Sequence, residues 1–304
     1  MIPLKVGFAG LGRMGAPMAA RIAEHGFPLA VWNRTAARAE ALAEALAGPL
    51  AARGVRVAGT LPELAAGSNV IITMLSDGAA ARAVWAGPGG LLEACAPGTI
   101  GVDMSTTGPR AARDIASRAE RAGVRFLDAP VSGSVALAEQ GGLTAMAGGD
   151  PCALAKALPV LAAVTAKQLH LGPQGAGAAM KLAVNIMIAA TNQAVAEGLA
   201  LAAQAGIDPR DAYEALTASA VSSPFLRYKR GAYLEPGDGP VSFTTTLMAK
   251  DLQLALDIAG EAALPLALAA AAKESLDQAR AAGFGDADFA CVARLLREGR
   301  PPPG

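Results

Sequence analysis

The sequence has few of the side chains on which metal sites, disulfide frameworks and histidine-based catalysis depend. Its 304 residues include three cysteines and two histidines. Three widely separated cysteines exclude a disulfide framework and a cysteine-rich zinc site. With His25 and His170 as the only histidines, we expect no metal site, no Ser-His-Asp triad and no histidine general base. A lysine is then the natural group to give or take a proton.

The charge balance and the apolar runs exclude further classes of protein. The 26 basic and 26 acidic side chains cancel, whereas non-specific nucleic-acid binding needs a basic surface. Apolar residues make up 53% of the chain, too many for a disordered protein. The longest apolar stretch, residues 182–201, is interrupted by Asn185, Asn192 and Glu197, so we expect a buried helix and no membrane span. We expect no cleavable leader at the start, and a cytoplasmic protein.

The first half of the chain alternates short apolar segments with helical stretches. The apolar segments are residues 4–9, 29–32, 69–74, 98–103 and 124–128, and helices are expected over residues 15–24, 36–47 and 109–122. This alternation is typical of βαβ units, whose strands form a parallel sheet that is buried on both faces. Two further strands, over residues 143–147 and 168–171, are expected to extend the sheet.

The pattern changes near Gly172, after which strand signals vanish. One long helix is expected over residues 176–204, stopped by Gly206, since glycine readily adopts the left-handed conformation of a helix end. Shorter helices are expected over residues 209–219, 246–263, 265–282 and 286–296. The sequence therefore predicts an α/β domain over residues 1–172, followed by an all-α domain over residues 173–304.

A glycine-rich motif follows the first strand and opens the first helix. It comprises Gly10, Leu11, Gly12, Arg13, Met14 and Gly15, and fits the pattern G-x-G-x-x-G. In this pattern the first glycine makes a tight turn, the second lets a pyrophosphate approach the backbone, and the third lets helix and strand pack closely. N–H groups at the positive helix end bind the pyrophosphate. We predict a Rossmann-type, doubly wound sheet that binds a dinucleotide through these residues; the alternative is a glycine-rich turn that binds nothing.

The end of the second strand bears on the choice of dinucleotide. Its residues are Asn33, Arg34 and Thr35, where NAD sites usually place an acidic residue on the ribose 2′-hydroxyl. An arginine can instead pair with the 2′-phosphate of NADP. We therefore expect these three residues to contact NADP. NAD is the alternative cofactor if Arg34 is only a solvated loop charge.

Residues after the next two strands are also expected to contact the cofactor, because ligands bind at the carboxyl ends of strands in open α/β sheets. These residues are Met74 and Leu75 after one strand and Thr106 after the other. The Thr106 hydroxyl is a candidate contact to the nicotinamide ribose. The alternative is a helix N-cap before Pro109.

Two polar residues near the start of the long helix are candidates for the chemistry. Lys181 is followed four residues later by Asn185, which puts both side chains on one face. Lys181 can protonate a carbonyl oxygen, and Asn185 can orient the lysine or the substrate oxygen. The alternative is that Lys181 extends along apolar surface toward solvent.

A serine-glycine turn follows the strand that ends at Asp128. Ser132, Gly133 and Ser134 offer several N–H and hydroxyl donors in one turn, which suits a small carboxylate. The alternative is a simple turn without a ligand.

Four motifs occur in an order that identifies a family. They are Gly10-x-Gly12-x-Met14-Gly15-x-Pro17-Met18-Ala19, Asp128-Ala129-Pro130-Val131-Ser132-Gly133, Gly175-x-Gly177-x-x-x-Lys181-Leu182 and Lys250-Asp251-Leu252-x-Leu254-Ala255. From Val6 to about Leu296 the chain resembles the β-hydroxyacid dehydrogenase family. That family includes 3-hydroxyisobutyrate dehydrogenase, tartronate semialdehyde reductase and the glyoxylate/succinic semialdehyde reductases.

The resemblance implies roles for individual residues. Lys181 would be the general acid/base, assisted by Asn185. Ser132 and Gly133 would bind the carboxylate of a small substrate. Thr106 would lie near the nicotinamide, and Lys250 would reach back over the cofactor.

The chain departs from the family at two positions. Val184 stands where many members have the first of two asparagines, and Ser134 stands where glycine or threonine is common and can reshape the pocket. The run Asn33-Arg34-Thr35 resembles the NADP-using semialdehyde reductase branch. The resemblance also implies a helical second domain that is built into homodimers or homotetramers.

The sequence thus predicts an oxidoreductase that transfers a hydride between NADP(H) and a small β- or γ-hydroxy acid or aldehyde acid. One alternative is an imine reductase on the same scaffold, a class that usually lacks the catalytic lysine. Another is a non-catalytic NADP-binding module, which would need a spoiled site. The longer enzyme 6-phosphogluconate dehydrogenase shares the NADP signature, but its helical domain is larger than this chain can hold.

Overall fold

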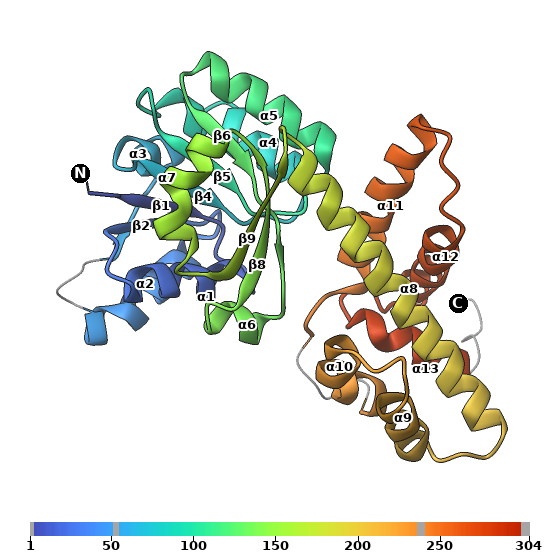
Figure 1. Cartoon of the computed structure of the whole chain (residues 1–304). Coiled ribbons are helices and arrows are strands. Elements are labelled where there is room, and N and C mark those ends of the chain that lie inside the picture. Colours follow the sequence, from blue (N-terminus) through green and yellow to red (C-terminus); the bar gives the residue numbers. More distant parts are fainter. Residues whose placement is uncertain (1–2, 51–54, 236–240, 299–304) are drawn as a thin grey trace. The chain divides into compact units, whose positions relative to one another are not determined.

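The computed structural model describes residues 3–50, 55–235 and 241–298. The chain divides into two compact units, Met1–Lys181 and Leu182–Gly304. In the described residues, the first unit contains a sheet covered by helices and the second is built from helices (Figure 1).

A nine-stranded sheet forms the first unit, in the order β3-β2-β1-β4-β5-β6-β8-β7 with β9 beside β8. Its strands are β1 (Val6–Ala9), β2 (Leu29–Trp32), β3 (Val55–Val57), β4 (Val70–Thr73), β5 (Ile100–Asp103), β6 (Arg125–Asp128), β7 (Val131–Ser132), β8 (Leu143–Gly149) and β9 (Thr165–Gly172). The strands from β3 to β6 pair in parallel. Strand β8 is antiparallel to β6 and β7 and parallel to β9. The predicted mostly parallel sheet and its extension are confirmed.

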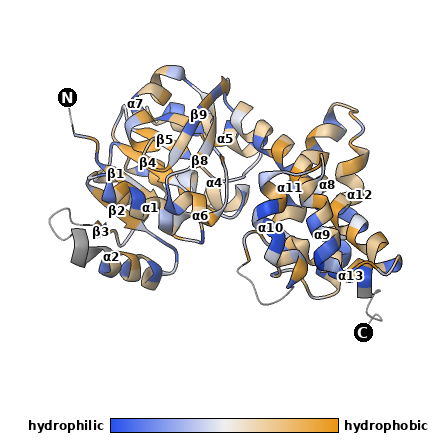
Figure 2. Ribbon diagram, turned by 60° about the horizontal axis from the view of Figure 1, so that its bottom comes forward, coloured by the Kyte–Doolittle hydropathy of each residue, from blue (hydrophilic) through white to orange (hydrophobic). Residues whose placement is uncertain are grey.

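Helices pack on both faces of this sheet. The helices of the unit are α1 (Gly15–Glu24), α2 (Ala36–Leu50), α3 (Leu61–Ala66), α4 (Gly78–Ala86), α5 (Pro109–Arg121), α6 (Val135–Glu139) and α7 (Pro151–Leu161). One apolar cluster joins α1, α6 and α7 to strand residues such as Ile72, and a second joins α3, α4 and α5 to residues such as Ile71. Because neighbouring strand residues point to opposite faces, strands such as β2 and β4 contribute to both clusters. Figure 2 shows the central strands as hydrophobic.

Two of the helices that the alternation did not predict, α3 and α4, illustrate how polar caps start a helix. The Thr60 hydroxyl accepts a hydrogen bond from the Glu63 N–H at the start of α3. The Asp77 carboxylate accepts one from the Ala80 N–H, 2.8 Å away, at the start of α4. Such side chains satisfy N–H groups that have no partner within the helix. The cap residues were therefore the signal in the sequence for these two helices.

The second unit packs its helices around a separate core. They are the remainder of α8 (Ala176–Gln204), α9 (Pro209–Ala218), α10 (Pro224–Leu234), α11 (Thr245–Glu261), α12 (Ala267–Ala281), the 3-10 helix η3 (Phe289–Cys291) and α13 (Val292–Glu298). Tyr213, Tyr233, Leu252 and Phe289 are buried in this core. The predicted bounds of α8 agree with the structure, whereas α10 was not predicted.

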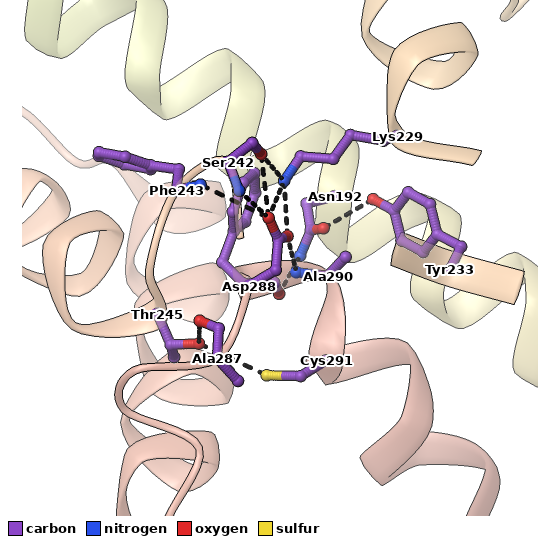
Figure 3. A network of polar contacts seen from close by, with 11 residues as sticks. Asn192, Lys229, Tyr233, Ser242, Phe243, Thr245, Ala287, Asp288, Ala290 and Cys291 are labelled. Atoms are coloured by element: carbon purple, nitrogen blue, oxygen red, sulfur yellow. Dashed lines mark hydrogen bonds and ion pairs between the residues drawn. The ribbon is translucent and has the colours of Figure 1, made fainter. Parts of the chain in front are cut away.

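A buried ion pair connects three segments of the second unit (Figure 3). Lys229 Nζ on α10 lies 2.5 Å from Asp288 Oδ1, and these side chains are 2% and 13% exposed. Asp288 Oδ2 accepts hydrogen bonds from the N–H and the hydroxyl of Ser242 at 3.0 and 2.9 Å. Burial alone would raise the pKa of Asp288, but the Lys229 charge and the hydrogen bonds outweigh it and lower that pKa. Asp288 therefore favours its ionised form opposite Lys229, and it also holds Ser242, three residues before α11.

The helix predicted over residues 286–296 is wrong in its first half. Residues 286–288 are not helical, η3 covers Phe289–Cys291, and α13 begins at Val292 and runs to Glu298. The reason is Asp288, which is extended and caps η3 by accepting from the Ala290 N–H at 3.0 Å. Its carboxylate also pairs with Lys229, and the chain bends there to make both contacts.

Helix α8 buries one side and exposes the other, so the expectation of a buried helix holds for one side only. Asn185, Asn192 and Leu199 are buried, whereas Met187 and Leu201 are 73% and 74% exposed. Among the described residues, α8 is the one helix long and apolar enough to cross a membrane, judged by length and composition alone. One such helix is weak evidence for a membrane protein, because a core helix passes the same test.

The division between the units lies inside α8, at Lys181, nine residues beyond the boundary expected from the sequence after residue 172. The first turns of α8 belong to the first unit because they bond to the sheet. Asp128 accepts hydrogen bonds from the N–H groups of Gly175 and Ala178.

Candidate cofactor and substrate site

The glycine-rich turn lies at the carboxyl end of β1, between that strand and α1. Gly10 has a φ of 102°, and its N–H donates to the Trp32 carbonyl at 3.0 Å. A Cβ on Gly10 would lie 2.3 Å from the Met74 carbonyl oxygen, so the turn packs directly against the residue that follows β4. The structure thus brings the motif and Met74 together.

The residues of the turn fit a pyrophosphate. A Cβ on Gly12 would meet no protein atom within 4 Å, whereas one on Gly15 would lie 1.9 Å from the Gly10 carbonyl oxygen. The N-cap of α1, Met14, makes no side-chain cap hydrogen bond, and the first turn contains no acidic residue. A helix start of this kind attracts an anion through its N–H groups. The space beside Gly12 and the charge preference of α1 both suit a dinucleotide.

The two glycines predict two different mutant phenotypes. We expect Gly15→Ala to lower the free energy of unfolding by about 1–3 kcal/mol, because its methyl group must displace backbone. We expect Gly12→Ala to keep the stability of the parent protein and to weaken NADPH binding by about 10-fold or more, since its methyl group occupies space needed by the ligand. Urea unfolding and a fluorescence titration with NADPH measure the two quantities. Unimpaired NADPH binding by Gly12→Ala would contradict a pyrophosphate at this turn.

Asn33 connects the end of β2 to the glycine-rich turn. Its Oδ1 accepts a hydrogen bond from the Leu11 N–H at 2.9 Å, and its Nδ2 donates to the Thr35 carbonyl at 3.0 Å. Asn33 therefore orders the loop itself. Arg34 and Thr35 are exposed beside it, with Arg13 exposed on the turn. Arg34 places its positive charge at the end of β2, where the ribose 2′-substituent is expected.

Asp103 at the end of β5 ties together the loops that follow β4 and β5. Its Oδ1 accepts hydrogen bonds from the hydroxyls of Thr73 and Ser105 at 2.8 and 2.6 Å. The Ser105 hydroxyl accepts in turn from the Leu75 N–H at 2.7 Å. Burial raises the pKa of Asp103 to about 6, while these hydrogen bonds oppose the shift. Met74, Leu75 and Thr106 thus lie on two loops that one buried carboxylate holds in register.

The serine-glycine turn is built as the sequence suggested, and Ser134 has a structural role in it. Ser132 ends β7, and Gly133 has a φ of 144°, which favours glycine. Ser134 is the N-cap of α6 and accepts from the Leu137 N–H at 3.3 Å. Among the three, Ser132 and Gly133 are the better candidates for a substrate carboxylate.

Asp128 fixes the start of α8 at the edge of the sheet where β5 and β6 end. Its two oxygens accept from the N–H groups of Gly175 and Ala178 at 2.7 and 2.8 Å. Burial raises the pKa of Asp128, and these N–H groups oppose the shift. Asp128 pairs in register with Asp103, so both lie at the same edge. Lys181 follows Ala178 by three residues, about 4.5 Å along the helix axis.

Asn185, one turn beyond Lys181 on α8, meets α11 inside the second unit. Its Nδ2 donates to Asp251 Oδ2 at 2.6 Å, and both side chains are buried. Lys250 Nζ lies 3.0 Å from Asp251 Oδ1. The structure thus brings together Asn185 and Lys250, which the resemblance had named, through a carboxylate that had been given no role.

Sequence reasoning missed three buried aspartates, two in the first unit and one in the second, that contact or adjoin the candidate residues. Asp103, Asp128 and Asp251 are each 1% exposed. Asp128 and Asp251 appear in the motifs, and Asp103 and Asp128 are the last residues of apolar strands. A charged residue ending a buried strand was the available signal, because such a group must find hydrogen-bond partners.

Comparison with known proteins agrees with this architecture. Residues 5–172 match the family model described as the NAD binding domain of 6-phosphogluconate dehydrogenase. Residues 175–296 match the model described as the NAD-binding of NADP-dependent 3-hydroxyisobutyrate dehydrogenase. Together with the glycine-rich turn and the strand order, these matches define the chain as an NAD(P)-dependent oxidoreductase.

Individual relatives match over nearly the whole chain. Glyoxylate/succinic semialdehyde reductase 1 of Arabidopsis thaliana is 34% identical, over 98% of this chain and 100% of that protein. 2-(Hydroxymethyl)glutarate dehydrogenase of Eubacterium barkeri is 33% identical, over 97% of this chain and 95% of that protein. The structure of Mycobacterium tuberculosis 3-hydroxyisobutyrate dehydrogenase with L-serine has a TM-score of 0.81 at 32% identity, covering 97% of this chain and 100% of that one. The chain belongs to the β-hydroxyacid dehydrogenase family.

Proposed function

We propose that this protein reduces a small aldehyde or keto acid with NADPH to the β- or γ-hydroxy acid, and catalyses the reverse oxidation through the same groups. One observation carries the proposal: Lys181 and Asn185 lie one turn apart on α8, whose start Asp128 clamps to the carboxyl edge of the sheet. That edge is where open α/β sheets bind their ligands.

Each residue has a defined task in this reaction. Ser132 and Gly133 bind the substrate carboxylate. Lys181 donates a proton to the carbonyl oxygen during reduction and takes it back from the hydroxyl during oxidation. Asn185 holds the lysine or the reacting oxygen in place. The bound nicotinamide supplies or accepts the hydride.

The substrate class is a short hydroxy acid or its aldehyde. The relatives named above act on small acids of this kind according to their names, and the M. tuberculosis structure holds L-serine, itself a β-hydroxy carboxylic acid. The test is oxidation of NADPH with glyoxylate, succinic semialdehyde, tartronate semialdehyde and methylmalonate semialdehyde. Turnover with at least one supports the proposal and names the branch. Absence of turnover with all four contradicts it.

Arg34 supports a preference for NADP over NAD. We expect Arg34→Ala to raise the KM for NADPH by about 10-fold, because a charge-assisted hydrogen bond to the 2′-phosphate is lost. The KM for NADH should not change, since NADH lacks that phosphate. Arg118→Ala, which removes an exposed arginine from α5, is the control and should alter neither value. Equal KM values for NADPH and NADH in the parent protein would refute the preference.

We also propose a homodimer or homotetramer that covers the apolar side of α8. Met187 and Leu201, both more than two-thirds exposed, support it, because patches of this kind mark interaction surfaces. Sedimentation equilibrium measures the assembly, and a monomer at micromolar concentration would refute it.

A further inference from the structure

Asp251 on α11 is a fully buried carboxylate that touches two residues of the proposed site. Its side chain is 0% exposed in the ion pair with Lys250, whose own side chain is 23% exposed. Its second oxygen, Oδ2, accepts the 2.6 Å hydrogen bond from Asn185 Nδ2. Asn185 and Asp251 are 66 residues apart in the chain, so the contact is made only by the fold.

The chemistry of this contact fixes the orientation of the Asn185 side chain. An ionised carboxylate only accepts hydrogen bonds, and the Lys250 ammonium beside Asp251 favours the ionised form. The group that faces Asp251 must then be the NH₂ of the amide. The amide oxygen of Asn185 consequently points away from the carboxylate, where it can only accept a hydrogen bond.

We infer that Asp251 is a positioning residue for the proposed reaction: it holds Asn185 so that the amide oxygen is offered as an acceptor to Lys181 or to the substrate hydroxyl. The inference rests on the proposed function. A flipped amide would present NH₂ to a lysine ammonium, and both groups would be donors. Asp251 thereby selects, through Asn185, the orientation that can hold a proton-donating lysine.

Asp251 contacts both Lys250 and Asn185. Its proposed role in orienting Asn185 must therefore be distinguished from simple charge pairing with Lys250. If Asp251 only stabilised Lys250, its removal would act through the lysine and would not depend on Asn185. If it orients Asn185, its removal has no further effect once the amide is gone. The two cases differ in additivity, which a double-mutant cycle measures.

The experiment compares kcat for aldehyde reduction in the parent protein, Asp251→Asn, Asn185→Ala and the double variant. We expect Asp251→Asn to lower kcat about 10- to 100-fold with little change in substrate KM, the size of effect that small misplacement produces. In the Asn185→Ala background the same substitution should have almost no effect. Equal fold-losses in both backgrounds would overturn the inference.

Two controls accompany the cycle. Asp257→Asn removes a carboxylate on the same helix that also accepts from an amide, Gln253 Nε2 at 2.7 Å, but at an exposed position. It should leave kcat unchanged. Lys250→Met removes the ion pair but keeps the Asp251 side chain, so it should lower kcat less than Asp251→Asn does.

A measurement without turnover tests the same contact. In a proton–nitrogen correlation spectrum of the parent protein, the Asn185 NH₂ signal is identified by its loss in Asn185→Ala. We expect one of its protons to be shifted downfield by the carboxylate, and to return upfield in Asp251→Asn or Asp251→Ser. An ordinary shift in the parent protein would overturn the inference even if neither Asp251 variant folds.

The two proposals fail in different ways. A parent protein that turns over none of the four aldehydes refutes the proposed function, and the downfield Asn185 signal still reports the contact. A parent protein that is active but shows additive losses refutes the role of Asp251 alone.

Discussion

Replacing Lys181 with alanine should lower kcat for aldehyde reduction by about 100- to 10,000-fold, the contribution of a positioned general acid. Lys181 lies on the second turn of α8, whose start is held by hydrogen bonds to Asp128. Its removal therefore deletes the proposed proton donor without disturbing that anchor. NADPH affinity and the urea unfolding midpoint should stay near those of the parent protein. Stopped-flow single-turnover measurements with NADPH separate the chemical step from product release.

Two further variants sharpen the test of Lys181. Lys181→Arg keeps the positive charge but cannot give up its proton, so it should be nearly as inactive as the alanine variant. Lys156→Ala removes an exposed lysine from α7 and should be fully active. Wild-type turnover in Lys181→Ala would exclude this residue as the acid/base. Retained activity in Lys181→Arg alone would show that only its charge matters.

Replacing Lys229 with methionine should lower the free energy of unfolding by about 3–5 kcal/mol, because it leaves the Asp288 carboxylate buried without its counter-ion. The pair is 2.5 Å long and almost fully enclosed, with the ammonium also 4.1 Å from the centre of the Phe289 ring. Ser242 and the Ala290 N–H would still contact Asp288 but cannot neutralise it. Urea unfolding followed by circular dichroism measures the loss.

The chain offers a matched control for this ion pair. Lys273 and Asp277 on α12 also lie 2.5 Å apart, but their side chains are 20% and 39% exposed. Lys273→Met should therefore cost no more than about 1 kcal/mol. The double variant Lys229→Met, Asp288→Asn should recover part of the loss because no buried charge remains. Equal losses for Lys229→Met and Lys273→Met would mean that burial does not control the contribution.

The same pair sets a dependence on pH. The pKa of Asp288 in the folded protein is lowered below its ordinary value. The unfolded chain then binds the proton first as pH falls, so the stabilisation is complete above about pH 4 and is lost below it. In Lys229→Met this part of the acid dependence should disappear.

Local patterns account for what could be predicted. The glycine-rich turn, the alternation of strands and helices, and the length of α8 follow from residues close together in the sequence, and the structure agrees with them. Helices α3 and α10 escaped because their evidence is a short cap, such as Ser223 accepting from the Leu226 N–H. A single cap residue predicts a helix less strongly than apolar residues that recur at helical spacing over many positions.

The sequence by itself determined the family, the dinucleotide turn, and the Lys181–Asn185 spacing, since each is read from short motifs without knowledge of contacts between distant residues. The tertiary structure alone decided which buried charges meet. Asp128 reaches Gly175 across 47 residues, Lys229 reaches Asp288 across 59, and Asn185 reaches Asp251 across 66. No local pattern encodes such pairings, because a buried carboxylate must be satisfied by whichever donors the path of the chain brings to it.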